Sequence, residues 1–193
     1  MPAARSSLKR RSGGENEPVR PGEGGASQRR RAGLKRAMAK TTPATLALDR
    51  AKIAYELHTY DYDPDASRVG LQAAESLGVS PDQVLKTLMA LVDGKPVCAV
   101  LASDQEVAMK KLAAAVGGKS AQMMKPADAE RMTGYRVGGV SPFGQKRQVP
   151  VVIDQAALDH ERVFVNGGQR GLQVRLAPSD LLVALPAKVA ILT

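Results

Sequence analysis

The chain has 193 residues, with 28 Lys and Arg, 19 Asp and Glu, two histidines and one cysteine. One cysteine excludes an intrachain disulfide, and Cys98 with the scattered His58 and His160 does not have the spacing of a zinc site. No apolar run approaches the roughly 18 residues of a membrane span, so we expect a cytoplasmic protein with no membrane contact, no metal and no cofactor.

The positive charge is concentrated in the first forty residues. Residues 1–40 hold eleven Lys and Arg and three Glu, whereas residues 41–193 hold seventeen Lys and Arg and sixteen Asp and Glu. The first segment also has six Gly, three Pro and no aromatic residue, which leaves too little apolar surface to offset the entropy of ordering. The composition therefore predicts a disordered basic extension over 1–40 and one folded domain over 41–193.

Helices and strands are mixed along the predicted domain. Thr42-Pro43 is a typical helix start, and a first helix is expected to run to about Lys52. The pattern then predicts, in chain order, a strand over 55–60, a helix over 70–77, a helical turn from 80, strands over 87–92 and 96–102, helices over 109–116 and 126–132, strands over 149–153, 162–165 and 172–176, a helix over 178–185 and a strand over 189–192. Turns at Asp93-Gly94 and at 166–168 indicate two hairpins, and this mixture predicts an α+β fold with a mixed sheet.

The glycine-rich segment 138–144 is the most informative stretch for function. Three glycines and one proline in seven residues impose an irregular backbone, whose N–H groups can approach a ligand and bind an oxyanion or a phosphate. The segment matches neither the phosphate loop of nucleotide hydrolases nor the dinucleotide-binding fingerprint. Taken alone, it is more simply interpreted as an ordinary loop.

Five other side chains are candidates for chemistry. Lys86 precedes an apolar strand, where it can act as an electrostatic catalyst or anion anchor, or simply as a solvated strand end. Tyr60 and Tyr135 can stack on a base or donate a hydrogen bond, or can be partly buried with the hydroxyl in water. Cys98 lies in an apolar strand and is interpreted as a core residue rather than a nucleophile. Ser141 lacks the GxSxG elbow, which argues against a serine-triad hydrolase.

In combination, these stretches resemble the YbaK family of aminoacyl-tRNA deacylases, most closely its cysteinyl-tRNA(Pro) deacylases, over residues 42–192. The matching stretches are TPA at 42–44, LHTY at 57–60 with DP at 63–64, QVLKTL at 83–88, TGYRVGGVSPFGQK at 133–146 and GGQRGL at 167–172. The resemblance implies a mixed, barrel-like β-sheet surrounded by helices. It also implies catalytic roles for Lys86, as the family's essential lysine, and for Gly138 and Gly139, as the backbone that meets the substrate carbonyl. The substrate-binding residues that it implies are Tyr60, Tyr135, Ser141 and Gly168.

The function implied by the resemblance is trans-editing of cysteinyl-tRNA(Pro), or of cysteinyl-tRNA(Cys), by attack of the substrate's own thiol on its ester carbonyl. The partners would be the CCA end of the aminoacyl-tRNA and prolyl-tRNA synthetase. Attack by water, editing of alanyl-tRNA(Pro), a non-catalytic tRNA- or synthetase-binding module and nucleic-acid binding through the basic extension are the alternatives. Val69, Gln173 and the pair Asn166 and Gln169, which flank the double glycine, depart from the family pattern, and we expect them to influence amino-acid preference.

Overall fold

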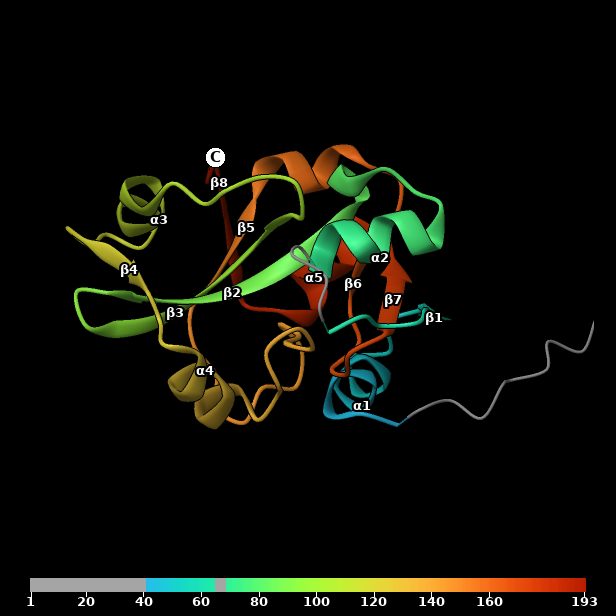
Figure 1. The fold of residues 1–193 in the computed structure, drawn as a ribbon. Helices are drawn as coiled ribbons and strands as arrows, with labels where there is room; N and C mark the ends of the chain where they lie inside the picture. Colours follow the sequence, from blue (N-terminus) through green and yellow to red (C-terminus); the bar gives the residue numbers. More distant parts are fainter. Residues whose placement is uncertain (1–40, 65–68) are drawn as a thin grey trace, which may run out of the picture. The chain divides into compact units, whose positions relative to one another are not determined.

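The computed structural model describes residues 41–64 and 69–193 (Figure 1). The predicted basic extension over 1–40 lies outside the described residues. No helix within these two ranges is long and apolar enough to cross a membrane.

The described chain folds into helices and strands in the order that the α+β prediction requires. The helices are α1 (Pro43–Arg50), α2 (Val69–Leu77), α3 (Met109–Ala115), α4 (Pro126–Thr133) and α5 (Pro178–Ala184), with 3-10 turns at Pro81–Gln83 and Gln155–Asp159. The strands are β1 (Glu56–Thr59), β2 (Val84–Val92), β3 (Lys95–Ala102), β4 (Ala121–Met123), β5 (Val151–Asp154), β6 (Val163–Asn166), β7 (Leu172–Leu176) and β8 (Ala187–Ala190).

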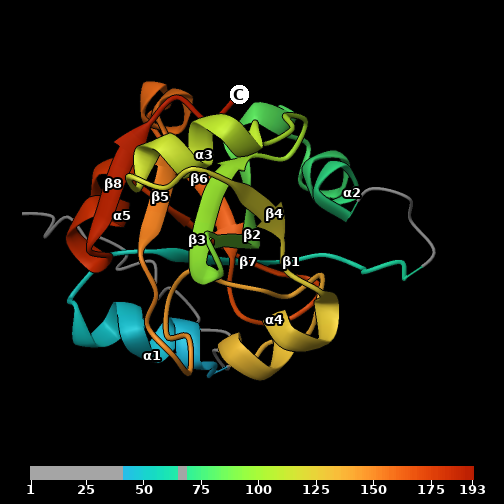
Figure 2. The same ribbon diagram turned by 90° about the vertical axis from the view of Figure 1, so that its left-hand side faces the viewer.

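Within the described residues, the strands form one eight-stranded mixed sheet. Its order is β1-β7-β6-β2-β3-β5-β8, and β4 pairs separately with β2. The pairs β2·β6, β3·β5 and β5·β8 are parallel, whereas β1·β7, β6·β7, β2·β3 and β2·β4 are antiparallel. Figure 1 and Figure 2 show α2 and α3 on one side of this sheet and α1 and α4 on the other. The predicted class, a mixed sheet surrounded by helices, is confirmed.

Local sequence signals explain several of these boundaries. Thr42 caps α1, because its hydroxyl accepts a hydrogen bond from the Thr45 N–H at 3.1 Å. Asp93 and Gly94 have φ values of 47° and 77°, the two positive angles that a type I′ hairpin turn requires. Gly134 ends α4 in the left-handed conformation with φ 80°. These three features form as the sequence predicts.

The side chains of β2 alternate between hydrophobic clusters on the two sides of the sheet. Leu85 and Met89 pack in the largest cluster, to which α1, α4 and α5 contribute. Ala90 and Val92 pack in a second cluster with α3. A buried strand with both faces covered fixes the direction of each of its side chains.

Three strands depart from the prediction: β8 (Ala187–Ala190) lies two residues before the predicted 189–192, β2 begins early and β4 is additional. β2 begins at Val84, three residues before the predicted start, because Val84 and Leu85 pair with β6 in parallel. Lys86 therefore lies inside the strand and not at its mouth. The three-residue β4 was not predicted, since it depends on pairing with the far end of β2.

Candidate functional site

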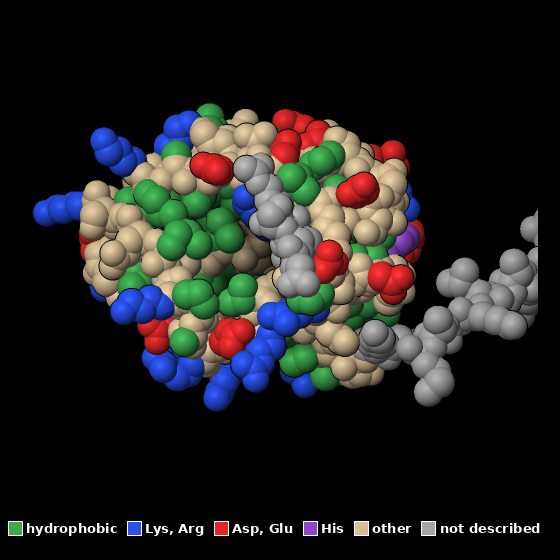
Figure 3. All heavy atoms as spheres, viewed as in Figure 1, with side chains coloured by type: hydrophobic (Ala, Val, Ile, Leu, Met, Phe, Trp, Pro, Cys, Tyr) green, Lys and Arg blue, Asp and Glu red, His purple; other side chains and the backbone are tan. Residues whose placement is uncertain are grey.

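A cavity of about 410 Å³ opens beside β2. Its walls come from residues 84–89, the start of α2, the end of β3, the region from β4 to α4, the glycine-rich segment and the β6–β7 hairpin. Figure 3 shows a hollow near the middle of this face, with hydrophobic side chains on one side and Lys and Arg side chains below it. The polar residues that line the cavity include Lys86, Thr87, Ser103, Asn166 and Gln173.

The cavity coincides with a gap in the sheet. β2 pairs with β6 only at Val84 and Leu85, and with β4 only from Ala90 onward. The Met89 carbonyl accepts the Met124 N–H at 3.0 Å, which shows that odd-numbered residues of β2 direct their main chain toward this edge. The main-chain groups of Thr87 face the same edge, where the described residues provide no strand partner. An unpaired strand edge inside a cavity can bind a polar ligand.

Lys86 contributes a cation to this cavity. Its ammonium group donates to the carbonyl of Ser103 at 3.3 Å and to the carbonyl of Gln105. The side chain is half-buried, and these two carbonyls at the end of β3 hold it in place. A fixed ammonium in a largely apolar cavity can stabilise a phosphate or a developing negative charge.

Strand register places Asn166 and Gln173 in the same cavity as Lys86. The β2–β6 pairing ends at Leu85 and Val165, the residues before Lys86 and Asn166, and Asn166 is paired with Gln173 on β7, so all three side chains line the same cavity. In the sequence, Asn166 and Gln173 stand out only as departures from a family pattern, with no link to Lys86. The connection depends on the pairing of β2 with β6, whose paired residues lie 80 positions apart in the chain. No local sequence pattern indicates such a pairing.

Polar groups without hydrogen-bond partners gather around the cavity. Among the described residues, the hydroxyl of Thr87, which lines the cavity, is buried and has no hydrogen-bond partner. The Gln173 side-chain oxygen and the hydroxyl of Tyr60, which is outside the cavity lining, are buried near each other and have no other partner. Burial raises the pKa of the Tyr60 phenol, and the nearby Gln173 side chain partly opposes that shift. Buried polar atoms without partners are costly in the absence of a ligand, which makes this cluster a candidate binding site.

The two glycines of the predicted catalytic loop lie in a tight turn but play different parts. The Gly139 N–H donates to the Arg136 carbonyl at 2.8 Å, and Gly138 has φ 86°, as in a type II turn. The Gly139 N–H is thus already used within the turn. Gly138 lines the cavity, and its N–H has no acceptor among the described residues. Of the two predicted oxyanion donors, only Gly138 offers an available N–H.

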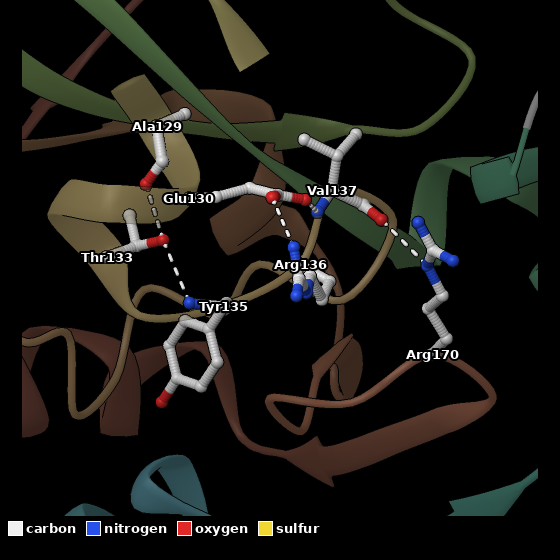
Figure 4. A network of polar contacts seen from close by, with 7 residues as sticks. All are labelled: Ala129, Glu130, Thr133, Tyr135, Arg136, Val137 and Arg170. Carbon is white, nitrogen blue, oxygen red and sulfur yellow. Dashed lines mark hydrogen bonds and ion pairs between the residues drawn. The ribbon is translucent and has the colours of Figure 1, made fainter. Parts of the chain in front are cut away.

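Side chains from neighbouring segments hold this turn in place, and Figure 4 shows two of them, Glu130 and Arg170. The Glu130 carboxylate of α4 accepts the Val137 N–H at 2.9 Å, and the Nε of Arg170 donates to the Val137 carbonyl at 2.9 Å. Asn166 donates to the Gly138 carbonyl at 3.2 Å. The Val137 N–H bond, together with an ion pair to Arg136 at 2.9 Å, lowers the pKa of Glu130. The turn therefore has a fixed orientation beside the cavity.

Tyr135, Ser141 and Gly168 lie behind the cavity wall and do not line it. The buried Tyr135 donates its hydroxyl to the Phe143 carbonyl at 2.7 Å, and burial raises its pKa to about 12. Ser141 is fully buried, and its hydroxyl accepts the Phe143 N–H at 3.3 Å. A Cβ on Gly168 would lie 2.8 Å from the Tyr135 ring. These residues pack the loop against the β6–β7 hairpin.

Comparison with known proteins identifies related chains. Residues 63–183 match the model of a family described as "Aminoacyl-tRNA editing domain". The chain is 35% identical to the Enterococcus faecalis protein named "Putative Cys-tRNA(Pro)/Cys-tRNA(Cys) deacylase EbsC", with 73% of this chain and 86% of that protein covered. It is 29% identical to a proline--tRNA ligase of Streptococcus suis, with 56% of this chain and 17% of the ligase covered. The structure of "a putative trans-editing enzyme for prolyl tRNA synthetase" shares the fold, with a TM-score of 0.67, 23% identity and coverage of 78% and 94%.

Proposed function

Because the chain belongs to the YbaK family of aminoacyl-tRNA editing domains, we propose that it deacylates cysteinyl-tRNA(Pro) in trans, with cysteinyl-tRNA(Cys) as a second substrate. The observation that carries this proposal is the cavity beside β2. It combines the Lys86 ammonium, the available Gly138 N–H and polar side chains without partners. The name of the Enterococcus faecalis relative, "Putative Cys-tRNA(Pro)/Cys-tRNA(Cys) deacylase EbsC", at 35% identity over 86% of that protein, supports cysteine as the amino acid that is removed.

The substrate bond is an ester between the amino acid and the terminal ribose of the tRNA. Its cleavage passes through an intermediate with negative charge on the former carbonyl oxygen. The Gly138 N–H is suited to receive that oxygen, because the turn around it is held by its neighbours; one such donor is worth roughly 3–4 kcal/mol in comparable sites. Lys86 balances the developing charge.

The nucleophile in this proposal is the thiol of the substrate cysteine. The ionised thiol attacks the ester carbonyl carbon and closes a four-membered thioester ring, while the ribose oxygen leaves and takes up the proton that the thiol lost. The lining of the cavity includes Leu88, Met89, Met123 and Met124. These apolar and polarisable side chains suit a small sulfur-containing group.

Cys98 does not compete for this role, because it is fully buried and burial raises its pKa to about 12. We expect Cys98→Ala to keep kcat within about twofold of wild type and to lower the free energy of unfolding by about 1 kcal/mol, through the loss of one buried sulfur atom. Steady-state deacylation and urea unfolding measure the two quantities. Loss of turnover in a folded Cys98→Ala enzyme would instead assign the attack to the protein's thiol.

Gly138→Ala is expected to lower kcat/KM by about tenfold or more. Its φ of 86° disfavours any side chain, and the new Cβ would lie 3.0 Å from the Tyr62 hydroxyl, so the turn would shift away from the substrate carbonyl. The cost in stability should be about 1–2 kcal/mol.

Gly94→Ala is the matched control for this substitution. Gly94 has a similar φ of 77° at the β2–β3 turn, with no atom within 4 Å of a new Cβ. The control should lose comparable stability and keep full activity. Equal activity in the two variants would remove the Gly138 N–H from the mechanism.

The direct test of the proposed function is deacylation of cysteinyl-tRNA(Pro) by the full chain, with alanyl- and seryl-tRNA(Pro) assayed beside it. Absence of cysteine release above the spontaneous rate would refute the proposal.

A further inference from the structure

We propose that Arg170 binds the phosphate on the 5′ side of the ribose that carries the amino acid. The inference rests on the proposed function, because this phosphate belongs to the tRNA substrate. It assigns to Arg170, a residue outside the cavity lining, the task of placing the 3′ end of the tRNA over Gly138.

The position of the Arg170 guanidinium is fixed by two contacts. Its Nε donates to the Val137 carbonyl at 2.9 Å, and its Cζ lies 5.3 Å from the centre of the Tyr62 ring. The side chain is exposed, and its two terminal nitrogens make no hydrogen bond or ion pair with the described residues. Figure 4 shows the guanidinium beside the Val137 carbonyl, with a dashed line to its Nε and none to its two terminal nitrogens. The guanidinium is thus held in position through its Nε, while its two terminal N–H groups, whose planar arrangement matches a phosphate, remain available.

Arg170 stands directly beside the cavity. A Cβ on Gly138, which lines the cavity, would lie 3.4 Å from the Arg170 Nε and 3.0 Å from the Tyr62 hydroxyl. The Val137 carbonyl and the Gly138 N–H point in opposite directions from one trans peptide unit, so Arg170 and a substrate carbonyl that meets this N–H lie on opposite sides of it. A substrate group that contacts the guanidinium must therefore extend across this peptide unit. In an aminoacyl-tRNA, the group on the far side of the ribose from the ester is a phosphate.

The charge around Arg170 also favours an anion. Residues 125–147 carry five Lys and Arg and two Asp and Glu, a net charge of +3, while residues 41–193 as a whole carry +1. Glu130, the acidic group of this segment that lies near Arg170, is engaged by the Val137 N–H and by Arg136 at 2.9 Å. Figure 3 shows Lys and Arg side chains below the hollow, and an excess of positive charge on this face attracts a polyanion.

The experiment compares two small substrates that differ by one phosphate. These are 3′-O-cysteinyl-adenosine and its 5′-monophosphate, and kcat/KM is measured for both with the full chain. We expect the wild-type enzyme to prefer the monophosphate by about tenfold or more, the effect of one charge-assisted contact. Arg170→Ala should reduce this preference to within about twofold, and Arg170→Lys, which keeps the charge but not the fork, should fall between them.

Lys119→Ala is the control, since Lys119 is an exposed lysine whose main chain bonds Asp93 at the far end of β2. It should keep the wild-type preference. An unchanged preference in Arg170→Ala overturns the inference and leaves the deacylase proposal intact.

Binding of an uncharged tRNA(Pro) acceptor minihelix, followed by fluorescence anisotropy at several salt concentrations, separates the two proposals. Arg170→Ala should weaken binding at low salt and reduce the salt dependence by about one counterion. If no substrate is turned over but this loss of binding is seen, the phosphate contact stands and the deacylase function falls.

Discussion

Lys86→Ala is expected to lower kcat/KM for cysteinyl-tRNA by about a hundredfold or more, because it removes the fixed cation of the cavity. The carbonyls of Ser103 and Gln105 hold the Lys86 ammonium. The ammonium therefore does not have to move when negative charge develops on the substrate. The fold should survive, since Lys86 lies in a strand whose neighbours Val84 and Leu85 are fully packed. We expect a loss of about 1 kcal/mol in the free energy of unfolding, from the two carbonyls that lose a donor.

Lys95→Ala provides the matched control for this prediction. Lys95 is an exposed lysine at the start of β3 in the same hairpin, paired with Val92. Its replacement should leave kcat/KM within about twofold of wild type, as is usual for a surface substitution away from the site. Wild-type turnover by a folded Lys86→Ala enzyme would show that the cation takes no part in catalysis.

The identity of the esterified amino acid should change the deacylation rate at least as strongly as Lys86→Ala does. With the substrate thiol as nucleophile, seryl-tRNA should be deacylated about a hundredfold or more slowly, because a hydroxyl is far less ionised and less nucleophilic than a thiol near neutral pH. Alanyl-tRNA, which has neither group, should not react above its spontaneous rate. Single-turnover deacylation of the three charged tRNAs by one enzyme preparation measures these rates.

The pH profile provides an independent check of the same mechanism. The rate on cysteinyl-tRNA should rise with pH toward the ordinary thiol pKa of about 8.5, as the attacking group ionises. Cys98→Ala should leave this profile in place, because the pKa of Cys98, about 12, lies above the measured range. Rapid turnover of alanyl-tRNA would favour attack by water and the alanine-editing alternative.

The local signals in the sequence determined much of the fold. Asp93-Gly94 specifies the β2–β3 hairpin because both residues take the positive φ angles of its turn. Thr42 specifies the start of α1 through its hydroxyl, and Gly134 ends α4 because glycine enters the left-handed conformation without strain. These effects operate within a few residues, so a single sequence is enough to locate them.

The sequence also singled out Lys86 and Gly138, the two candidate site residues that line the cavity. The sequence could not distinguish Gly138 from Gly139. The two differ because the Gly139 N–H donates a hydrogen bond within the turn and the Gly138 N–H does not. From the sequence alone, Tyr135, Ser141 and Gly168 are as good candidates for pocket residues as Lys86 and Gly138. The structure places them in the layer that packs the loop against the hairpin.

Tertiary structure alone decided where the cavity opens. The Thr87 edge is exposed because β6 stops pairing after Leu85 and β4 begins pairing only at Ala90. Gln173 faces the cavity because β7 pairs with β6 in one register, and a shift by one residue would turn it to the other face. Arg170 acquires its position from a carbonyl 33 residues away in the chain. Each of these features depends on contacts between distant segments, and it is the packing of the whole sheet that brings those segments together.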